Sequence, residues 1–210
     1  MIFETLFRNE GTGSHHANDF SIDDALGFSG VFNLLTDRDP MPGFERVDLL
    51  GNHDAWMLSF LDDPDVGPVW MANGGLETLL SYGVGRPAEA DPAQRNAAMS
   101  NALASALPAM HLDFLRRLAT THREGGFLFV HAGIRPGLAI EAQQPDDLLW
   151  IREPFLTDER DHGFIVVHGH TIAERPEVMD NRIGIDTGAF ATGRLTCLVL
   201  EGSAHRFLQT

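Results

Sequence analysis

The stretch FIVVHGHT, residues 164–171, is an apolar run that ends abruptly in histidine and glycine. A short apolar run bounded by turn formers is typical of a buried strand. Two other stretches have the same order, RVDLLGNHD at 46–54 and FLFVHAG at 127–133. Ligands of α/β proteins gather beyond the carboxyl ends of strands. The pattern therefore predicts that the polar residues after these three strands form one site.

The rest of the chain predicts helices mainly in its first half and strands mainly in its second. Apolar residues at helical spacing occupy 54–61, 75–82 and 108–121, and in the last of these Met110, Phe114, Leu115 and Leu118 are expected to face inward. Besides the three runs above, strands are expected at 182–185 and 195–200, with 206–208 closing a last hairpin. We therefore expect an α/β or layered α+β domain.

The composition is that of a globular protein with a strong acidic excess. The 210 residues are 43% apolar and carry a formal net charge of −15 at pH 7. That charge argues against general nucleic-acid binding, which needs clustered Lys and Arg, and against docking on an anionic membrane. No apolar run approaches the about 18 residues of a membrane span, and the N-terminus lacks the pattern of a secretory signal. A cytoplasmic location is therefore the expectation.

The residue types after the three strands favour a metal bound by nitrogen and oxygen. The single cysteine, Cys197, excludes an intrachain disulfide and a cysteine-based zinc cluster, and its apolar neighbours predict a core position. The alternating histidines of 168–170 would be typical of a nucleotidyl hydrolase, but Ile172 breaks the alternation. Imidazole nitrogens and amide oxygens are good ligands for manganese, iron or zinc. A lone histidine after a strand is more often structural, so the inference depends on the three clusters together.

In this order, the clusters resemble those of the calcineurin-like metallophosphoesterases. The resemblance is to the phosphoprotein phosphatase branch, which includes bacterial serine/threonine phosphatases and symmetrical diadenosine tetraphosphate hydrolases. It spans roughly Ser29 to the C-terminus and implies a layered β-sandwich flanked by helices. The stretches that carry it are GNHD at 51–54, HAGIRPG at 131–137, LLWIRE at 148–153, VVHGHT at 166–171 and IDTGA at 185–189.

The resemblance implies a metal site and a phosphate site. Asn52, His131 and His170 would hold one metal of a two-metal centre, and Arg152 would clamp phosphate oxygens. Manganese is the expected metal, with iron, zinc, nickel and magnesium as alternatives. Two metals about 3.5–4 Å apart can hold a bridging hydroxide and polarise a phosphoryl group, and a planar guanidinium matches two phosphate oxygens.

The resemblance also implies a proton donor and a class of substrate. His53 would be the general acid for the leaving alkoxide, with Asp54 orienting it. The expected activity is phosphoester hydrolysis, first of phosphorylated serine or threonine in a protein. There are two alternatives. One is hydrolysis of a dinucleoside polyphosphate, and the other is an inactive fragment that only binds a partner or phosphate.

The sequence departs from the family's pattern at its N-terminal end. The family begins with Gly-Asp-x-His-Gly and Gly-Asp-x-x-Asp-Arg-Gly, and neither is present. Asp37-Arg38 mimics the second block, but Leu34 stands where its bridging aspartate would be. Residues 1–27 are interpreted as unpatterned and foreign to the family, and 28–210 as an incomplete metallophosphoesterase domain that lacks N-terminal strands. The hypothesis is that the sequence is a truncated or frame-shifted reading of a longer phosphatase. We expect such a protein to bind one metal or none and to show weak or absent turnover.

Four polar or aromatic residues near the motifs have a structural interpretation. His168 is expected to pack or hydrogen-bond, and Asp186 to bond backbone amides in a turn. Trp56 and Trp150 are expected in the core. Arg135 has two open interpretations, a solvated neighbour of the proline turn or a phosphate contact.

Overall fold

The structure is a computed structural model that describes residues 3–9, 14–20, 44–88, 91–202 and 204–210. The chain divides into two compact units. The described part of the first unit comprises residues 3–9, 14–20, 44–52, 118–202 and 204–210, and that of the second comprises 53–88 and 91–117.

The first unit contains an antiparallel sheet of five strands in the order β10-β9-β2-β1-β3. These strands are β1 (Phe3–Asn9), β2 (Ser14–Phe20), β3 (Phe44–Leu49), β9 (Thr196–Glu201) and β10 (Ala204–Gln209). In the register of the sheet, Leu6 of β1 lies opposite Val47 of β3. The last two strands form the expected hairpin, in which Phe207 lies opposite Leu198.

A second sheet of the same unit has the order β4-β5-β6-β8-β7. Its strands are β4 (Thr121–Glu124), β5 (Phe127–Val130), β6 (Ile165–His168), β7 (Glu177–Val178) and β8 (Arg182–Gly184). The central strands β5, β6 and β8 run parallel, whereas β4 and β7 are antiparallel to their neighbours. Parallel strands end at the same edge of a sheet, so the loops after β5, β6 and β8 leave the second sheet on one side.

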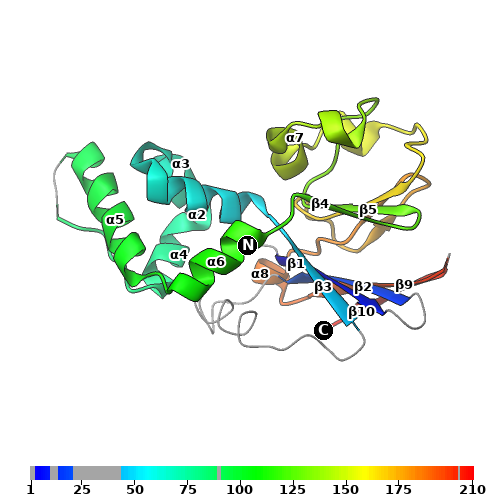
Figure 1. Cartoon of the computed structure of the whole chain (residues 1–210), viewed down its shortest axis with the longest axis horizontal. Coiled ribbons are helices and arrows are strands. Elements are labelled where there is room, and N and C mark those ends of the chain that lie inside the picture. Colours follow the sequence, from blue (N-terminus) through cyan, green and yellow to red (C-terminus); the bar gives the residue numbers. More distant parts are fainter. Residues whose placement is uncertain (1–2, 10–13, 21–43, 89–90, 203) are drawn as a thin grey trace. The chain divides into compact units, whose positions relative to one another are not determined.

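The two sheets pack face to face around a shared core (Figure 1). Leu49, Leu198 and Leu200 from the first sheet join Phe129 and residues of β6 and β8 from the second in one buried cluster. Alternate residues of a strand point to opposite faces. Leu128 and Val130 of β5 therefore belong to a different buried cluster, which also holds residues of α7 (Pro145–Trp150) and η4 (Phe155–Thr157). The first unit is thus a layered β-sandwich with a helical layer.

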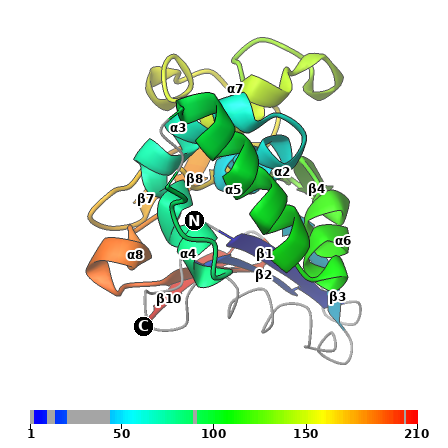
Figure 2. The ribbon, with the colours of Figure 1, turned by 90° about the vertical axis from the view of Figure 1, so that its left-hand side faces the viewer.

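The second unit is helical (Figure 2). It contains α2 (Asn52–Asp62), whose first residue still belongs to the first unit, η1 (Pro64–Val66), α3 (Gly67–Trp70), η2 (Met71–Gly75), α4 (Leu76–Ser81), α5 (Pro92–Ala106) and α6 (Ala109–Arg117). Phe60 packs against Trp70, with ring centroids 5.4 Å apart, and both side chains are fully buried. No helix in the described part of the chain is long and apolar enough to cross a bilayer.

The fold confirms the predicted α/β class and most of the predicted elements. The predicted helix at 108–121 is shorter, and Met110 is exposed rather than inward. Helix α5 was not expected, because it is rich in alanine and polar residues, and only Asn96, Met99, Ser100 and Leu103 of it are buried. Cys197 lies on β9 and is half-buried, and this burial raises the pKa of its thiol to about 11.

The N-terminal interpretation needs correction. The sequence predicts no strand in residues 3–9 and 14–20, but they form β1 and β2 at central positions of the first sheet. The facing edges of β3 and β9 are consequently paired with them instead of being left open. Pairing with distant strands outweighs a weak local pattern, because strand formation depends strongly on context. The Asp37-Arg38 mimic lies outside the described residues.

Candidate metal and phosphate site

Two loops that leave the second sheet at the same edge, together with the end of β3, carry the predicted metal ligands. His131 follows β5, and His170 follows β6 after the intervening Gly169. The two loops are joined by a backbone hydrogen bond of 2.8 Å from the Gly169 N–H to the His131 carbonyl. Asn52 follows β3, whose extension at Leu50 donates a 2.7 Å hydrogen bond to the carbonyl of Ala119.

The three predicted ligands lie together in the first unit. Asn52 Oδ1 is 3.0 Å from His131 Nε2, and both side chains are more than nine-tenths buried. The ring centroids of His131 and His170 are 5.1 Å apart at an interplanar angle of 61°. Buried polar side chains normally hydrogen-bond to one another or bind a ligand. We therefore take this arrangement as a candidate site.

His170 has the geometry of an imidazole prepared to accept a ligand. Its backbone has φ +61°, the only positive value for a non-glycine residue in the described chain. The ring donates a hydrogen bond to the backbone carbonyl of Trp150, while its Nε2 is buried and has no hydrogen-bond partner among the described residues. Burial, with a smaller effect of the Arg152 charge, lowers the pKa of His170 to about 4. A neutral ring held through one nitrogen leaves the lone pair of the other for a cation.

Arg152 lies close enough for its charge to act on His170. It follows α7 and is exposed, and its carbonyl accepts a 2.9 Å hydrogen bond from the Leu156 N–H. The neighbouring Trp150, half-buried rather than fully in the core, contacts the His170 ring edge to face at 5.8 Å. A guanidinium beside a histidine pair is suited to binding an anion that also contacts a cation.

Arg135, for which the sequence left two interpretations, is committed to a carboxylate. Its Nε donates to Asp147 Oδ2 at 2.8 Å, and its terminal nitrogen donates to the other oxygen of the same carboxylate. The pKa of Arg135 is raised by this hydrogen bond and by the charge of Asp147. The pair joins the loop after β5 to α7, so Arg135 braces the site.

His168 and Asp186 have the structural roles that the sequence predicted. His168 is buried edge to face against Phe155 at 5.0 Å, and its Nδ1 is 3.1 Å from the Gly169 carbonyl. Burial lowers the pKa of His168 to about 4. Asp186 Oδ1 accepts a 2.9 Å hydrogen bond from the Gly188 N–H in the turn after β8, and burial raises the pKa of Asp186.

His53 and Asp54 occupy the first turn of α2 in the second unit. The His53 ring contacts the half-buried Trp56 edge to face at 5.4 Å, and Asp54 is fully buried. The Asp54 charge adds to burial in raising the pKa of Tyr82, whose hydroxyl is 3.0 Å from Nδ1 of the buried His111. Neither Tyr82 nor His111 lies in a motif, so no sequence pattern points to them. The pairing of His53 with Asp54 stays a prediction.

The donor set is small but suits one divalent cation. No group of three or more His, Cys, Asp or Glu side chains is placed to hold a metal within the ranges that the structure describes. The candidate set instead combines two imidazoles with the amide of Asn52. Two ligands at right angles, each about 2.1 Å from a cation, lie about 3.0 Å apart. Asn52 Oδ1 and His131 Nε2 are hydrogen-bonded to each other at 3.0 Å, and this separation also fits two ligands of one cation.

Comparison with known proteins supports the fold only. No family model and no curated protein sequence matches the chain. Among solved structures, the crystal structure of a candidate diadenosine tetraphosphatase is similar, with a TM-score of 0.51 and 17% sequence identity. The match covers 77% of this chain and 67% of that chain. The chain thus has a mixed α/β fold similar to that of this structure.

Proposed function

We propose that this chain is a metal-dependent phosphoester hydrolase. The observation that carries the proposal is the buried cluster of Asn52 and His131, 3.0 Å apart, beside a His170 whose Nε2 has no hydrogen-bond partner in the described structure. The charge of Arg152, which helps to lower the pKa of His170, supports a place for its guanidinium in the same site. Cation ligands beside a guanidinium are what a phosphoester site needs.

Each residue of the cluster has a proposed role. Asn52, His131 and His170 would hold a divalent cation, manganese in the first instance. When bound, such a cation supplies Lewis acidity to a phosphoryl group and lowers the pKa of water. Arg152 binds and orients two phosphate oxygens. The brace between Arg135 and Asp147 keeps α7, and with it the segment that presents Arg152, against the loop after His131.

His53 is proposed to donate a proton to the leaving oxygen, with Asp54 orienting its ring. His53 follows Asn52 directly in the chain, and its packing against Trp56 limits the orientations of the imidazole. An imidazole is suited to this role because its ordinary pKa is near neutrality. The motif at 51–54, rather than a measured contact with a substrate, supports this assignment.

Two classes of substrate are candidates for this hydrolase. Phosphoserine or phosphothreonine in a protein is the first candidate, because the motifs resemble those of phosphoprotein phosphatases. A dinucleoside polyphosphate is the second, and it is favoured by the candidate activity of the structurally similar protein. A protein that binds phosphate without hydrolysing it is the alternative outside enzymology.

Metal binding is the first test. We expect the purified 210-residue chain to bind Mn²⁺ in calorimetry, and elemental analysis to find about one ion per chain. His170→Ala is expected to weaken binding at least about tenfold, because it removes a ligand. His205→Ala, which changes an exposed histidine on β10, is the matched control and keeps wild-type affinity. Equal affinity in both variants would disprove the proposed ligand set.

Hydrolysis is the second test. With Mn²⁺, p-nitrophenyl phosphate is expected to be hydrolysed slowly, and a phosphopeptide compared with diadenosine tetraphosphate identifies the substrate class. His53→Asn should lower kcat while Mn²⁺ binding persists, since His53 is proposed to act on the proton and not on the cation. Metal binding without any turnover would support the binding-only alternative, and loss of metal in His53→Asn would make His53 a ligand.

A further inference from the structure

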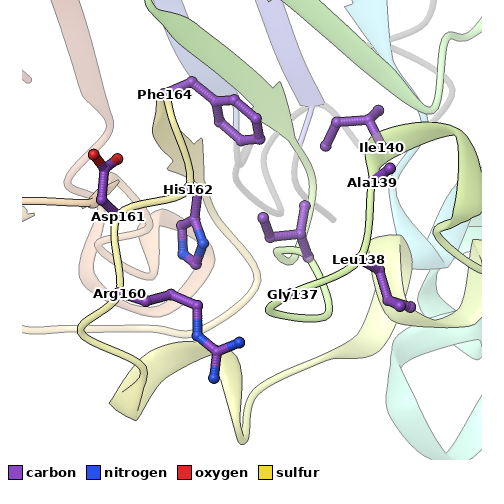
Figure 3. Close-up of a pocket in the computed structure, with 9 residues that line it drawn as sticks. Gly137, Leu138, Ala139, Ile140, Arg160, Asp161, His162 and Phe164 are labelled. Carbon is purple, nitrogen blue, oxygen red and sulfur yellow. The ribbon is translucent and has the colours of Figure 1, made fainter.

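A pocket of about 270 Å³ lies in the first unit between the loop after β5 and the loop before β6 (Figure 3). One wall is apolar and the other is polar. Figure 3 shows Leu138 and Ile140 on one side and the His162 ring with Arg160 on the other. Gly137, Asp161 and Phe164 also line the pocket.

Both walls are fixed by buried side-chain amides. Gln143 accepts a 2.7 Å hydrogen bond from the Arg135 N–H and donates to the carbonyls of Arg135 and Leu138. On the other wall, Asn181 donates to the carbonyls of Asp158 and Arg160 at 2.7 and 3.0 Å. Gln143 and Asn181 are 8% and 6% exposed. A site held in this way loses little conformational freedom when a ligand binds.

Gly137 makes room for the guanidinium of Arg160 at this pocket. A Cβ atom on Gly137 would lie 2.7 Å from Arg160 Nη1, and the glycine has φ +84°. Arg160 Nε lies 2.8 Å from Asp158 Oδ2, whereas its terminal nitrogens make no hydrogen bond with the residues that the structure describes. The guanidinium therefore keeps donors that can bind an anion beside an apolar wall.

The charges at the polar wall disfavour a ligand with more than one negative charge. His162 is stacked on Phe155, and burial lowers the pKa of its ring below the ordinary histidine value. Asp158 offsets the charge of Arg160, and Asp161 adds a negative charge, although its carboxylate points away from Leu138 in Figure 3. One guanidinium against two carboxylates disfavours a dianion such as a phosphate monoester.

We propose that this pocket binds a small aromatic monocarboxylate, with its ring against Phe164 and Ile140 and its carboxylate on Arg160. An aromatic ring gains contact area on the apolar wall, and the carboxylate gains hydrogen bonds from the guanidinium. This binding site does not depend on the proposed hydrolase activity, because none of the residues that line the pocket is assigned to that activity.

The probe for the test is 4-fluorobenzoate, followed by ¹⁹F NMR titration of the whole chain in the presence of EDTA. The dissociation constant is expected in the millimolar range. In ¹H–¹³C spectra of the protein, the methyl signals of Leu138 and Ile140 should shift when the ligand is added. The neutral 4-fluorobenzamide and the dianionic 4-fluorophenyl phosphate should bind more weakly. Arg160→Met should weaken 4-fluorobenzoate at least about tenfold, because it removes a charge-assisted hydrogen bond, and should leave 4-fluorobenzamide unchanged.

Two glycine variants and one arginine variant complete the test. Gly137→Ala should weaken 4-fluorobenzoate severalfold by displacing the guanidinium. Gly125→Ala also has a positive φ but has nothing within 4 Å of the added Cβ, so it should bind as the wild type does. Absence of binding to the wild type, equal binding by Arg160→Met, or tighter binding of the phosphate would overturn the proposal. The proposal would also be overturned if Arg152→Met no longer bound 4-fluorobenzoate while Arg160→Met bound it as the wild type does.

Discussion

His131 Nε2 and Asn52 Oδ1 lie 3.0 Å apart, although the two residues are 79 positions apart in the chain. Asn52 follows a strand of the first sheet and His131 follows a strand of the second. The contact therefore joins the two layers of the sandwich, and it places an amide oxygen and an imidazole nitrogen where one cation could be bound by both. The geometry of this pair makes the ligand assignment testable by single-atom changes.

Replacing Asn52 separates its role as a ligand from its role in packing. Asn52→Leu keeps the size of the side chain and removes the oxygen, so Mn²⁺ affinity should fall at least about tenfold. Asn52→Asp keeps an oxygen and adds a charge that divalent cations favour, so its affinity should equal or exceed that of the wild type. Isothermal titration with Mn²⁺ measures both. Wild-type affinity in Asn52→Leu would exclude Asn52 from the ligand set.

Arg152 should be detectable through the titration of His170. The positive charge of Arg152 is the second cause of the lowered pKa of His170, after burial. Arg152→Met should therefore raise that pKa from about 4, while burial keeps it below the ordinary value of about 6.5. Arg152→Lys retains the charge and should change the pKa little. NMR titration of the metal-free protein follows the His170 ring, and an unchanged pKa in Arg152→Met would place the guanidinium away from the cluster.

The strands that carry the site were predictable because each is a short apolar run that ends in a turn former. Burial on both faces of the parallel strand β5 keeps Phe127, Leu128, Phe129 and Val130 largely out of water, and such strands show as continuous apolar runs. The proximity of His131 and His170 followed from the rule that ligands gather at the carboxyl ends of strands. The rule identifies which residues lie near a site but not which side chains they contact. The hydrogen bond from Arg135 to Asp147 could therefore not be predicted from the sequence.

Other features depend on contacts between distant residues. β1 and β2 lack a strong local pattern and form through pairing with β3 and β9. The contact of Tyr82 with His111 joins residues 29 positions apart, outside every motif. The pocket beside Arg160 depends on a glycine at a positive φ, and sequence alone does not show which glycine makes room for a guanidinium.

Burial of His168 predicts a loss of stability in mild acid. The folded state lowers the pKa of this ring to about 4, whereas the unfolded chain has the ordinary value near 6.5. The unfolded state therefore binds the proton first, so the stabilising contribution is complete above about pH 6.5 and is lost as the pH falls toward 4. This group should lower the free energy of unfolding of the metal-free protein, measured with urea, by about 2 kcal/mol between pH 7 and 4.5. In His168→Gln that part of the pH dependence should disappear.

Gly133 should be the least replaceable glycine of the loop that carries His131. Its φ is +152°, and an added Cβ would lie 2.3 Å from Cδ1 of the fully buried Phe155. Phe155 also packs against His168 and His162, so it cannot move without disturbing both. Overpacking of this kind costs about 1–3 kcal/mol, and Gly133→Ala should therefore lower Tm by about 2–12 °C.

Gly126→Ala is the matched control for this change, since nothing lies within 4 Å of its added Cβ and its φ is not positive. Its Tm should stay within about 1 °C of the wild type. Gly133→Ala should also weaken Mn²⁺ binding. His131 lies two residues before Gly133, so the backbone shift that relieves the contact with Phe155 also displaces His131. Scanning calorimetry and Mn²⁺ titration of the two variants check both effects. A Gly133→Ala protein with wild-type Tm would mean that the loop can yield without cost, and the rigid presentation of His131 would then have no structural basis.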